Sequence, residues 1–198
     1  MSGSTIDFWF DFGSTYSYLS AFAAASQGSR VRHRPFLLGP IFKRQGWDTS
    51  PFNIYEAKGR YMWRDMERCC ASESLPLKRP SVFPRNGLLP ARVALCAEEE
   101  EWMPEFCRRV FSANFAEDRD IGAPAVVGEI LRTLDQDASA LLKRAAEPRT
   151  KELLRARTER AAELGIFGAP TFVVGGELFW GHDRLDRALA WPSTADSR

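Results

Sequence analysis

The sequence predicts one small α/β domain that is interrupted by a long block of helices. Two observations lead to this class: a strand–helix–strand pattern opens the chain, and a strand–strand–helix pattern closes it. The length of 198 residues suits one domain with a sizeable insertion. We expect residues 1–40 and 165–198 to form the α/β domain, and residues 41–164 to form the helical insertion domain with its connecting helix.

The first part of the chain predicts two strands joined by a helix. Residues 6–12 alternate apolar side chains with the period of two that a strand requires. Gly13 and Ser14 interrupt this pattern, and an Ala-rich segment over residues 16–27 then favours a helix. Residues 31–37 suit a second strand. A strand–helix–strand order of this kind implies parallel strands with a right-handed crossover.

The middle of the chain predicts a series of helices. Residues 38–51 are rich in Gly and Pro, so we expect an irregular segment there. Residues 75–90 carry four prolines and are expected to be a loop. The expected helices cover residues 53–70, 91–101, 104–115, 124–134, 138–146 and 149–164.

The last part of the chain returns to strands. Residues 171–174 and 177–180 are separated by a Gly-Gly pair, which is typical of a two-residue hairpin turn. A final helix is expected over residues 184–190, with His182 or Asp183 as its N-terminal cap.

Composition excludes several classes of protein. The formal net charge of +1 provides no overall field that would attract nucleic acid or an anionic membrane, so we expect neither partner. No apolar stretch approaches the length of a membrane span, and the first residues lack the pattern of a secretory signal. The four cysteines form no C-x-x-C pair and only two histidines occur, so we expect no metal site and reduced thiols in the cytoplasm. The run from Glu98 to Glu101 is expected to be a solvated helix end.

A few polar residues are candidates for chemistry. Ser14 lies at the start of the first helix, where free N–H groups would stabilise a thiolate or a phosphate, although an ordinary helix cap explains it as well. Asp183 could cap the last helix or accept the ammonium group of a ligand. Pro170 opens a strand, and X–Pro bonds at such positions are usually trans. Lys43 and Asn53 flank an irregular segment, in which a lone Lys is usually solvated.

Three separated motifs in this order resemble one known family. The segments are F-D-F-G-S-T-Y-S-Y-L near the start, and G-I-F-G-A-P-T-F-V and F-W-G-H-D-R-L near the end. They are similar to those of the 2-hydroxychromene-2-carboxylate isomerases, which are close to the kappa-class glutathione transferases. The resemblance extends over nearly the whole chain. It implies a thioredoxin-like fold split by a helical domain, a homodimer, and glutathione as cofactor.

The resemblance also implies roles for individual residues. Ser14 matches the serine that interacts with the sulfur of glutathione, and no Cys stands there, so thiol–disulfide exchange at this site is not expected. Ala169 matches the residue before a cis-proline, whose backbone pairs with the cysteinyl part of glutathione. The residues that match the γ-glutamyl site are Trp180, Gly181, His182 and Asp183, with His182 in place of the usual Asn.

On the substrate side, the resemblance implies Lys43 and Asn53 as binding residues. Phe83 stands where the family has a Tyr, and Asn86 is a candidate for a replacement donor. The implied reaction converts 2-hydroxychromene-2-carboxylate, or a related aromatic acid, into trans-o-hydroxybenzylidenepyruvate by reversible thiol addition. A kappa-like glutathione transferase and a non-catalytic thioredoxin-fold binding module are the alternatives, and the cysteine positions argue against a disulfide oxidoreductase.

Overall fold

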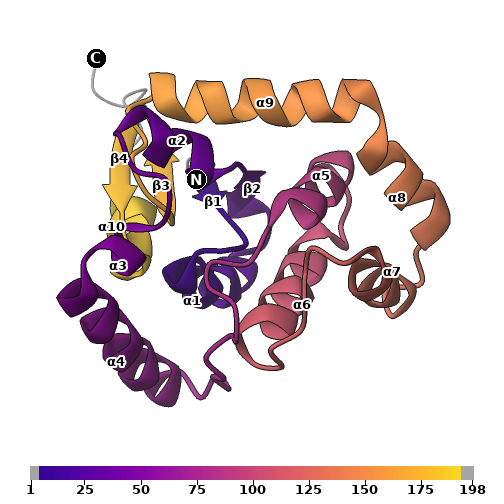
Figure 1. Cartoon of the computed structure of the whole chain (residues 1–198). Helices are drawn as coiled ribbons and strands as arrows, with labels where there is room; N and C mark the ends of the chain where they lie inside the picture. Colours follow the sequence, from indigo (N-terminus) through magenta and orange to yellow (C-terminus); the bar gives the residue numbers. More distant parts are fainter. Residues whose placement is uncertain (1–4, 193–198) are drawn as a thin grey trace.

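A four-stranded sheet forms the centre of the protein, which is seen in a computed structural model that describes residues 5–192 (Figure 1). The strand order is β2-β1-β3-β4. β1 (Ile6–Phe10) pairs in parallel with β2 (Val31–Pro35) on one side and antiparallel with β3 (Thr171–Val174) on the other. β4 (Glu177–Trp180) pairs antiparallel with β3 at the edge. The predicted parallel opening and the predicted hairpin are therefore confirmed.

The alternation of side chains along β1 creates a separate core on each face of the sheet. On one face, Phe8 stacks on Phe10 and Phe172 with ring centroids 5.0 and 5.3 Å apart. On the other face, Trp9 packs with Phe36 in a smaller cluster. Because successive residues of a strand point to opposite faces, one apolar strand supplies both cores.

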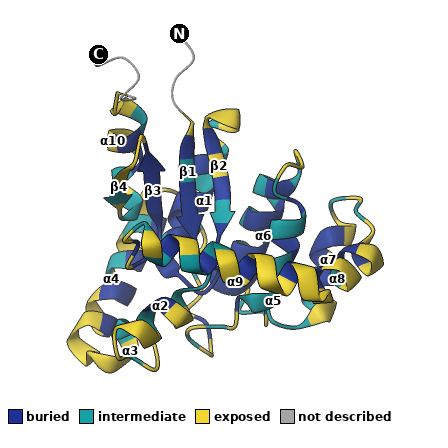
Figure 2. Ribbon diagram, turned by 90° about the horizontal axis from the view of Figure 1, so that it is seen from above, coloured by how far each residue is buried: buried dark blue, intermediate teal, exposed yellow. Residues whose placement is uncertain are grey.

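Helices of the α/β part cover these two faces. α1 (Thr15–Ala25) and α10 (Leu185–Ala190) pack against the face that carries the larger core. α2 (Leu38–Arg44) and α9 (Pro148–Glu163) contribute residues to the smaller core on the opposite face. Figure 2 shows that the central strands β1 and β3 are largely buried, while the edge strand β4 and one side of α9 are exposed.

The remaining helices form a block beside the sheet (Figure 1). The larger core continues from the sheet into this block, where Phe106 and Phe111 meet Phe12. The boundaries of a separate insertion domain at residues 41 and 164 stay a prediction, because one apolar core runs across both parts. The block consists of α3 (Pro51–Ile54), α4 (Glu56–Ser72), α5 (Leu88–Cys96), α6 (Met103–Phe115), α7 (Pro124–Arg132) and α8 (Ala138–Ala146).

Two segments expected to be irregular are partly helical. α2 begins at Leu38 although Gly and Pro follow, and α5 begins at Leu88 although Pro90 lies within it. In each case the proline is the third helical residue, where the missing N–H has no partner within the helix anyway. The expected loop over residues 75–90 therefore ends at Gly87.

The last helix, α10, differs from the prediction in its N-terminal cap. A short 3₁₀ turn, η2, covers His182–Arg184, and α10 begins only at Leu185. Neither His182 nor Asp183 caps α10, because Arg184 occupies the cap position and makes no side-chain bond there. The Asp183 carboxylate instead pairs with Arg184 at 2.6 Å. This correction removes the structural role that the sequence had offered for Asp183.

The acidic run Glu98–Glu101 lies in the turn after α5 and not within a helix end, and it contains one residue that is not simply solvated. The Glu98 side chain is 17% exposed and accepts hydrogen bonds from Arg157 at 2.7 and 2.8 Å, and it also pairs with Arg34 of β2. Burial alone would raise the pKa of Glu98, but hydrogen bonds from both arginines lower it below its ordinary value. Glu98 thereby joins the sheet, α5 and α9.

We expect Glu98→Gln to lower the free energy of unfolding at pH 7 by about 1–3 kcal/mol, because two partly buried guanidinium groups lose their carboxylate. Since the pKa of Glu98 is lowered in the fold, its contribution is present above the ordinary pKa of 4.5 and is lost as the pH falls through the folded value. In thermal melts, the two proteins should therefore differ at pH 7 and converge at acidic pH. Glu100→Gln, which alters an exposed carboxylate of the same run, is the matched control and should melt like the parent. A constant difference at every pH would contradict this role.

Candidate functional site

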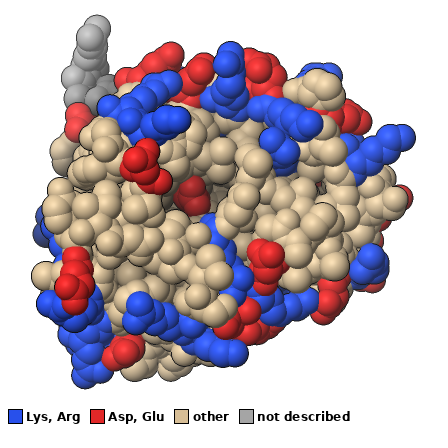
Figure 3. Space-filling model, viewed as in Figure 1, with Lys and Arg blue, Asp and Glu red and all other residues tan. Residues whose placement is uncertain are grey.

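A cavity of about 1230 Å³ opens at one end of the sheet. Its walls come from the β1–α1 turn, α2, α4, the loop before α5, the segment before β3, and η2. In the space-filling view, side chains that are mostly uncharged surround a hollow in the centre of this face (Figure 3). The cavity therefore joins residues from both ends of the chain with residues of the helical block.

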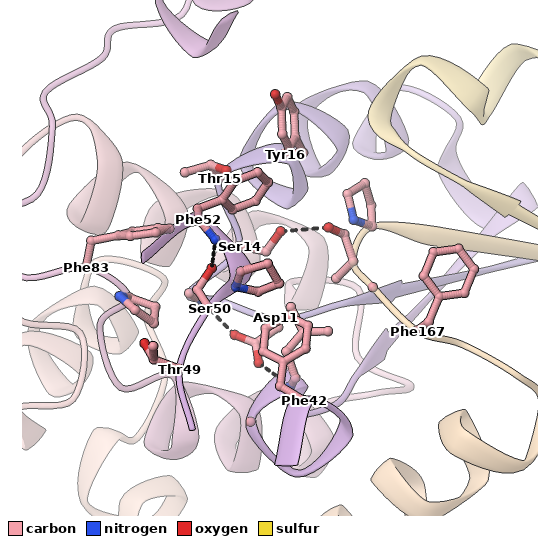
Figure 4. A pocket seen from close by; sticks show the side chains of 18 of the residues that line it. Asp11, Ser14, Thr15, Tyr16, Phe42, Thr49, Ser50, Phe52, Phe83 and Phe167 are labelled. Carbon is pink, nitrogen blue, oxygen red and sulfur yellow. Dashed lines mark hydrogen bonds between the residues drawn. The ribbon is translucent and has the colours of Figure 1, made fainter. Parts of the chain in front are cut away.

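Ser14 lies at the start of α1 and borders this cavity (Figure 4). Its Oγ accepts a hydrogen bond from the Ser17 N–H at 3.3 Å, so Ser14 is the helix cap. The same hydroxyl donates to the carbonyl oxygen of Ala169 at 2.9 Å. The two interpretations of Ser14 are thus compatible, since a capping hydroxyl also faces the cavity beside the partially positive end of a helix.

The segment before β3 supplies Ala169, the hydrogen-bond partner of Ser14. The Ala169–Pro170 peptide bond is cis, which confirms the prediction made from the resemblance. Both residues line the cavity. The Gly181 N–H donates to the carbonyl oxygen of Pro170 at 3.0 Å, which fixes the end of β4 beside this loop.

The four residues expected at the γ-glutamyl site all line the cavity. Trp180 is half exposed and packs on Phe167, with ring centroids 4.8 Å apart. Gly181 has a φ of +122°, a conformation that other residues rarely adopt. The His182 ring stacks on Tyr16 with centroids 5.1 Å apart. The resemblance implied that these residues share one site, and the structure places all four on the wall of one cavity.

Tyr16 connects this group to α4. Its hydroxyl donates to Oδ2 of Asp65 at 3.0 Å, and Asp65 also accepts from Arg68 at 2.7 Å. Burial and the nearby Asp65 carboxylate raise the pKa of Tyr16 well above its ordinary value. Cys69 lies on the same helix, with Sγ 3.7 Å from Nε2 of His182. The wall beside His182 is therefore held by a hydrogen-bonded chain that the sequence did not reveal.

A buried carboxylate, Asp11, was missed by the sequence reasoning. It accepts hydrogen bonds from the backbone N–H groups of Gly13 and Leu38, both at 2.7 Å, and it lines the cavity (Figure 4). Burial raises its pKa above the ordinary value, against the effect of the two N–H groups. Asp11 thus ties the β1–α1 turn to the first residue of α2. The sequence signal was an acidic residue inside an otherwise aromatic segment.

The expected substrate residues divide into two groups. Phe83 and Asn86 line the cavity, and the Oδ1 of Asn86 accepts from the Leu88 N–H at 2.9 Å. Lys43 and Asn53 do not line it. The Asn53 Nδ2 donates at 3.0 Å to the carbonyl oxygen of Phe83, and so supports the wall from behind.

The position of Lys43 follows from the unexpected helix α2. Leu38, Phe42 and Gln45 line the cavity, and they are spaced as residues on one helix face are. Lys43 is one residue from Phe42, about 100° around the helix, and is exposed. A substrate role for Lys43 therefore has no support from its position.

The wall of the cavity is largely apolar and includes several aromatic side chains. Among the described residues, the cations on its wall are Lys58, Arg85 and Arg184, of which Arg85 pairs with Asp118 and Arg184 with Asp183. Lys58 lies over the ring of Tyr55, 4.7 Å from its centroid. Such a cavity suits a flat, apolar ligand with one anionic group. The aromatic residues on its wall are Tyr16, Phe42, Trp47, Phe52, Tyr61, Phe83, Phe167 and Trp180.

Residues 5–192 offer no group of three or more His, Cys, Asp or Glu side chains arranged to hold a metal ion. All four cysteines are free, and none lies at Ser14, where a thiol would be needed for disulfide exchange. Within the same residues, no helix is both long and apolar enough to cross a membrane.

The sheet order, the cis-proline loop and the helical block together define a protein of the thioredoxin superfamily with a helical insertion. The chain belongs to the DSBA-like thioredoxin domain family, whose sequence profile matches residues 5–190.

Within this family, the chain is similar to two kinds of protein. The chain is 31% identical over 188 residues to the 2-hydroxychromene-2-carboxylate isomerase of Sphingobium xenophagum, covering 92% of this chain and 94% of that protein. It is 27% identical over 200 residues to human glutathione S-transferase kappa 1, covering 92% and 88%. A solved structure of 2-hydroxychromene-2-carboxylate isomerase superposes with a TM-score of 0.79 at 26% identity, covering 94% of this chain and 93% of that one. The thioredoxin-like fold expected from the sequence is confirmed.

We expect Asp11→Ala to lower the free energy of unfolding by about 1–3 kcal/mol, because two partly buried N–H groups lose their acceptor. The matched control is Asp48→Ala, which removes an exposed carboxylate from the wall of the same cavity and should leave the melting temperature unchanged. Melting curves of the three proteins provide the measurement. Equal stability of Asp11→Ala and the parent would show that Asp11 does not hold α2 in place.

Proposed function

We propose that the protein is a glutathione-dependent isomerase that acts on 2-hydroxychromene-2-carboxylate or a related aromatic acid. The observation that carries this proposal is the Ser14 hydroxyl at the N-terminus of α1, which lies on the cavity wall and is hydrogen-bonded to the residue before a cis-proline. The names of the relatives, an isomerase and a glutathione transferase, support the same assignment. The cavity of about 1230 Å³ has room for a tripeptide and an aromatic acid together.

The residues of the site fit the groups of glutathione. Ser14 and the free N–H groups of α1 would favour an ionised thiol, because both stabilise negative charge. The hydroxyl would turn from the Ala169 carbonyl oxygen towards the sulfur, which leaves that carbonyl free to accept from the peptide backbone. Asp183, which has no capping role, would accept the γ-glutamyl ammonium group. His182 would donate a hydrogen bond beside it while its ring stays stacked on Tyr16.

When bound, glutathione would supply a thiol that adds to a conjugated double bond and so permits rotation about it. The protein's own residues would hold the substrate during this rotation. The aromatic wall, including Phe52 and Phe83, would bind the ring by apolar contact and exclude water. Lys58 would bind the carboxylate, since it lines the cavity and has no acidic partner among the described residues.

A kappa-like glutathione transferase is the second candidate. Phe83 has no hydroxyl with which to orient a phenol, and the cavity wall is mostly apolar. Both features also suit transfer of glutathione to an uncharged electrophile. The two activities share the glutathione site and differ in the product.

A direct assay distinguishes an isomerase from a glutathione transferase and from a non-catalytic binding module. We expect 2-hydroxychromene-2-carboxylate to isomerise in the presence of the protein and glutathione, followed by absorbance, and not to do so with S-methylglutathione, which has no thiol. A chlorodinitrobenzene substrate tests for transfer in parallel. Stable conjugation of that substrate without isomerisation would favour the transferase. No turnover and no binding of glutathione in a calorimetric titration would leave a non-catalytic binding module.

We expect Ser14→Ala to reduce turnover about 10–150-fold, because one hydrogen bond to an anionic sulfur is lost. The variant also loses a helix cap, which costs about 0.5–2 kcal/mol of stability. Ser14→Thr, which keeps the hydroxyl, separates the two effects and should retain most of the activity. Rates are measured well below the melting temperature of each variant. Unchanged turnover in Ser14→Ala would reduce Ser14 to a helix cap.

We expect Lys58→Ala to raise the KM for an acidic substrate about tenfold or more while the affinity for glutathione stays the same, since a charge-assisted contact to the carboxylate is removed. Lys43→Ala is the matched control, because it removes an exposed cation that lies off the cavity wall. Steady-state kinetics and glutathione titrations provide the two readouts. A larger effect of Lys43→Ala would restore the assignment made from the resemblance.

A further inference from the structure

A second, smaller cavity of about 300 Å³ lies between α2, α5 and α9. We call it the basic recess. Leu37, Pro40 and Leu88 line both this recess and the large cavity, so the two share a wall. The motifs discussed above contribute nothing to the recess, and the proposed reaction does not use it.

Positive charge is concentrated in the basic recess. Four cations line it, against a single carboxylate, Glu159, among the described residues. Figure 3 shows Lys and Arg side chains, interspersed with Asp and Glu, along the edge of this face where α9 runs. The net charge of the whole chain is only +1, so the concentration is local. The four cations are Arg44 of α2, Arg92 of α5, and Lys151 and Arg155 of α9.

Most of this charge has no acidic partner. Arg155 pairs with Glu152 at 3.2 Å and lies 4.0 Å from Glu159. Within residues 5–192, the other three cations form neither an ion pair nor a side-chain hydrogen bond. The Nε atom of Arg92 is buried and has no hydrogen-bond partner. A buried donor without an acceptor is costly, and like charges that line one recess repel each other, so an anion bound there would be stabilising.

The floor of the recess strengthens this argument. It consists of Leu37, Pro40, Leu88 and Leu154. Apolar walls lower the local dielectric and focus the field of the cations into the cavity. The contrast with the large cavity is clear, because Asp11, Asp65 and Asp183 line that one.

We propose that the basic recess binds a small dianion of the phosphoryl class, either inorganic phosphate or a phosphate monoester. A guanidinium group matches the geometry of a phosphate by donating two parallel hydrogen bonds, and Arg44 and Arg92 approach the recess from different helices. A volume of about 300 Å³ accommodates such a group and excludes a polymer. The occupant would satisfy Nε of Arg92 and neutralise the three cations that have no acidic partner.

Binding at the recess would also act on the large cavity. α2 carries Arg44 to the recess, while Leu38 and Phe42 of the same helix line the large cavity. A dianion held between Arg44, Arg92 and Lys151 would fix α2 against α5 and α9. The recess is therefore an effector site that sets the position of one substrate wall.

The test is a calorimetric titration of the whole protein with inorganic phosphate, with chloride used to hold the ionic strength at roughly 0.15 M. We expect saturable binding at one site and a higher melting temperature with phosphate present. Phosphate monoesters titrated in parallel distinguish the free ion from an esterified source. Binding of phosphate no tighter than that of chloride would overturn the proposal.

Two variants that each remove one positive charge test whether phosphate binds in the basic recess. Arg92→Gln and Arg44→Gln should each weaken phosphate binding about tenfold or more and remove the increase in melting temperature. Arg187→Gln, an exposed cation of α10 outside the recess, is the matched control and should bind like the parent. Equal loss in all three variants would indicate a nonspecific charge effect and overturn the proposal.

A titration with phosphate in the presence of saturating glutathione completes the test. The recess site should bind phosphate with glutathione bound, and both variants should keep the parent's affinity for glutathione. If glutathione displaces phosphate and Arg92→Gln weakens both ligands, the recess belongs to the glutathione site and the separate anion site is wrong. Failure of glutathione to bind at all would refute the proposed function without affecting the phosphate result.

Discussion

The pairing of β1 with β3 is the constraint on which the site depends. β1 comes from the first residues of the chain and β3 from the last part, yet they are neighbours at the centre of the sheet. Their pairing brings the turn after β1 next to the loop before β3, and the hydrogen bond from Ser14 to Ala169 follows directly. Every other wall of the large cavity is built around this contact. The central strand thus organises both the apolar cores and the candidate chemistry.

The sequence predicted the elements that are specified locally. The hairpin bounds are correct because Gly175 and Gly176 both adopt positive φ, as tight hairpin turns require. The helix over Ala138–Ala146 is also correct, since Asp137 caps it from the adjacent position. In these segments, the information that determines the structure lies within a few residues.

The failures of prediction occur where a distant group determines the structure. α2 has no side-chain cap of its own, and its first N–H is bound by Asp11, a residue from another element. Because residues 38–51 were predicted to be irregular, the orientation of Lys43 on α2 could not be predicted. Asn53 likewise does not line the cavity, and its side chain donates to the carbonyl oxygen of Phe83. The site residues inferred near the two chain ends lie on the cavity wall, as do Phe83 and Asn86. Lys43 lies off the wall because its orientation depends on α2, a helix that the sequence did not reveal.

The separation of Ser14 and Ala169 by 155 positions has a consequence for how the protein acquires its site. During synthesis, the N-terminal half can collapse, but the contact cannot form until β3 has left the ribosome. The entropy of closing this long loop grows only with the logarithm of its length, about 0.6 kcal/mol for each doubling. Evolution could therefore lengthen or rebuild the intervening helices at little thermodynamic cost to the contact. The fold allows the helical walls of the large cavity to diversify while the contact between Ser14 and Ala169 stays in place.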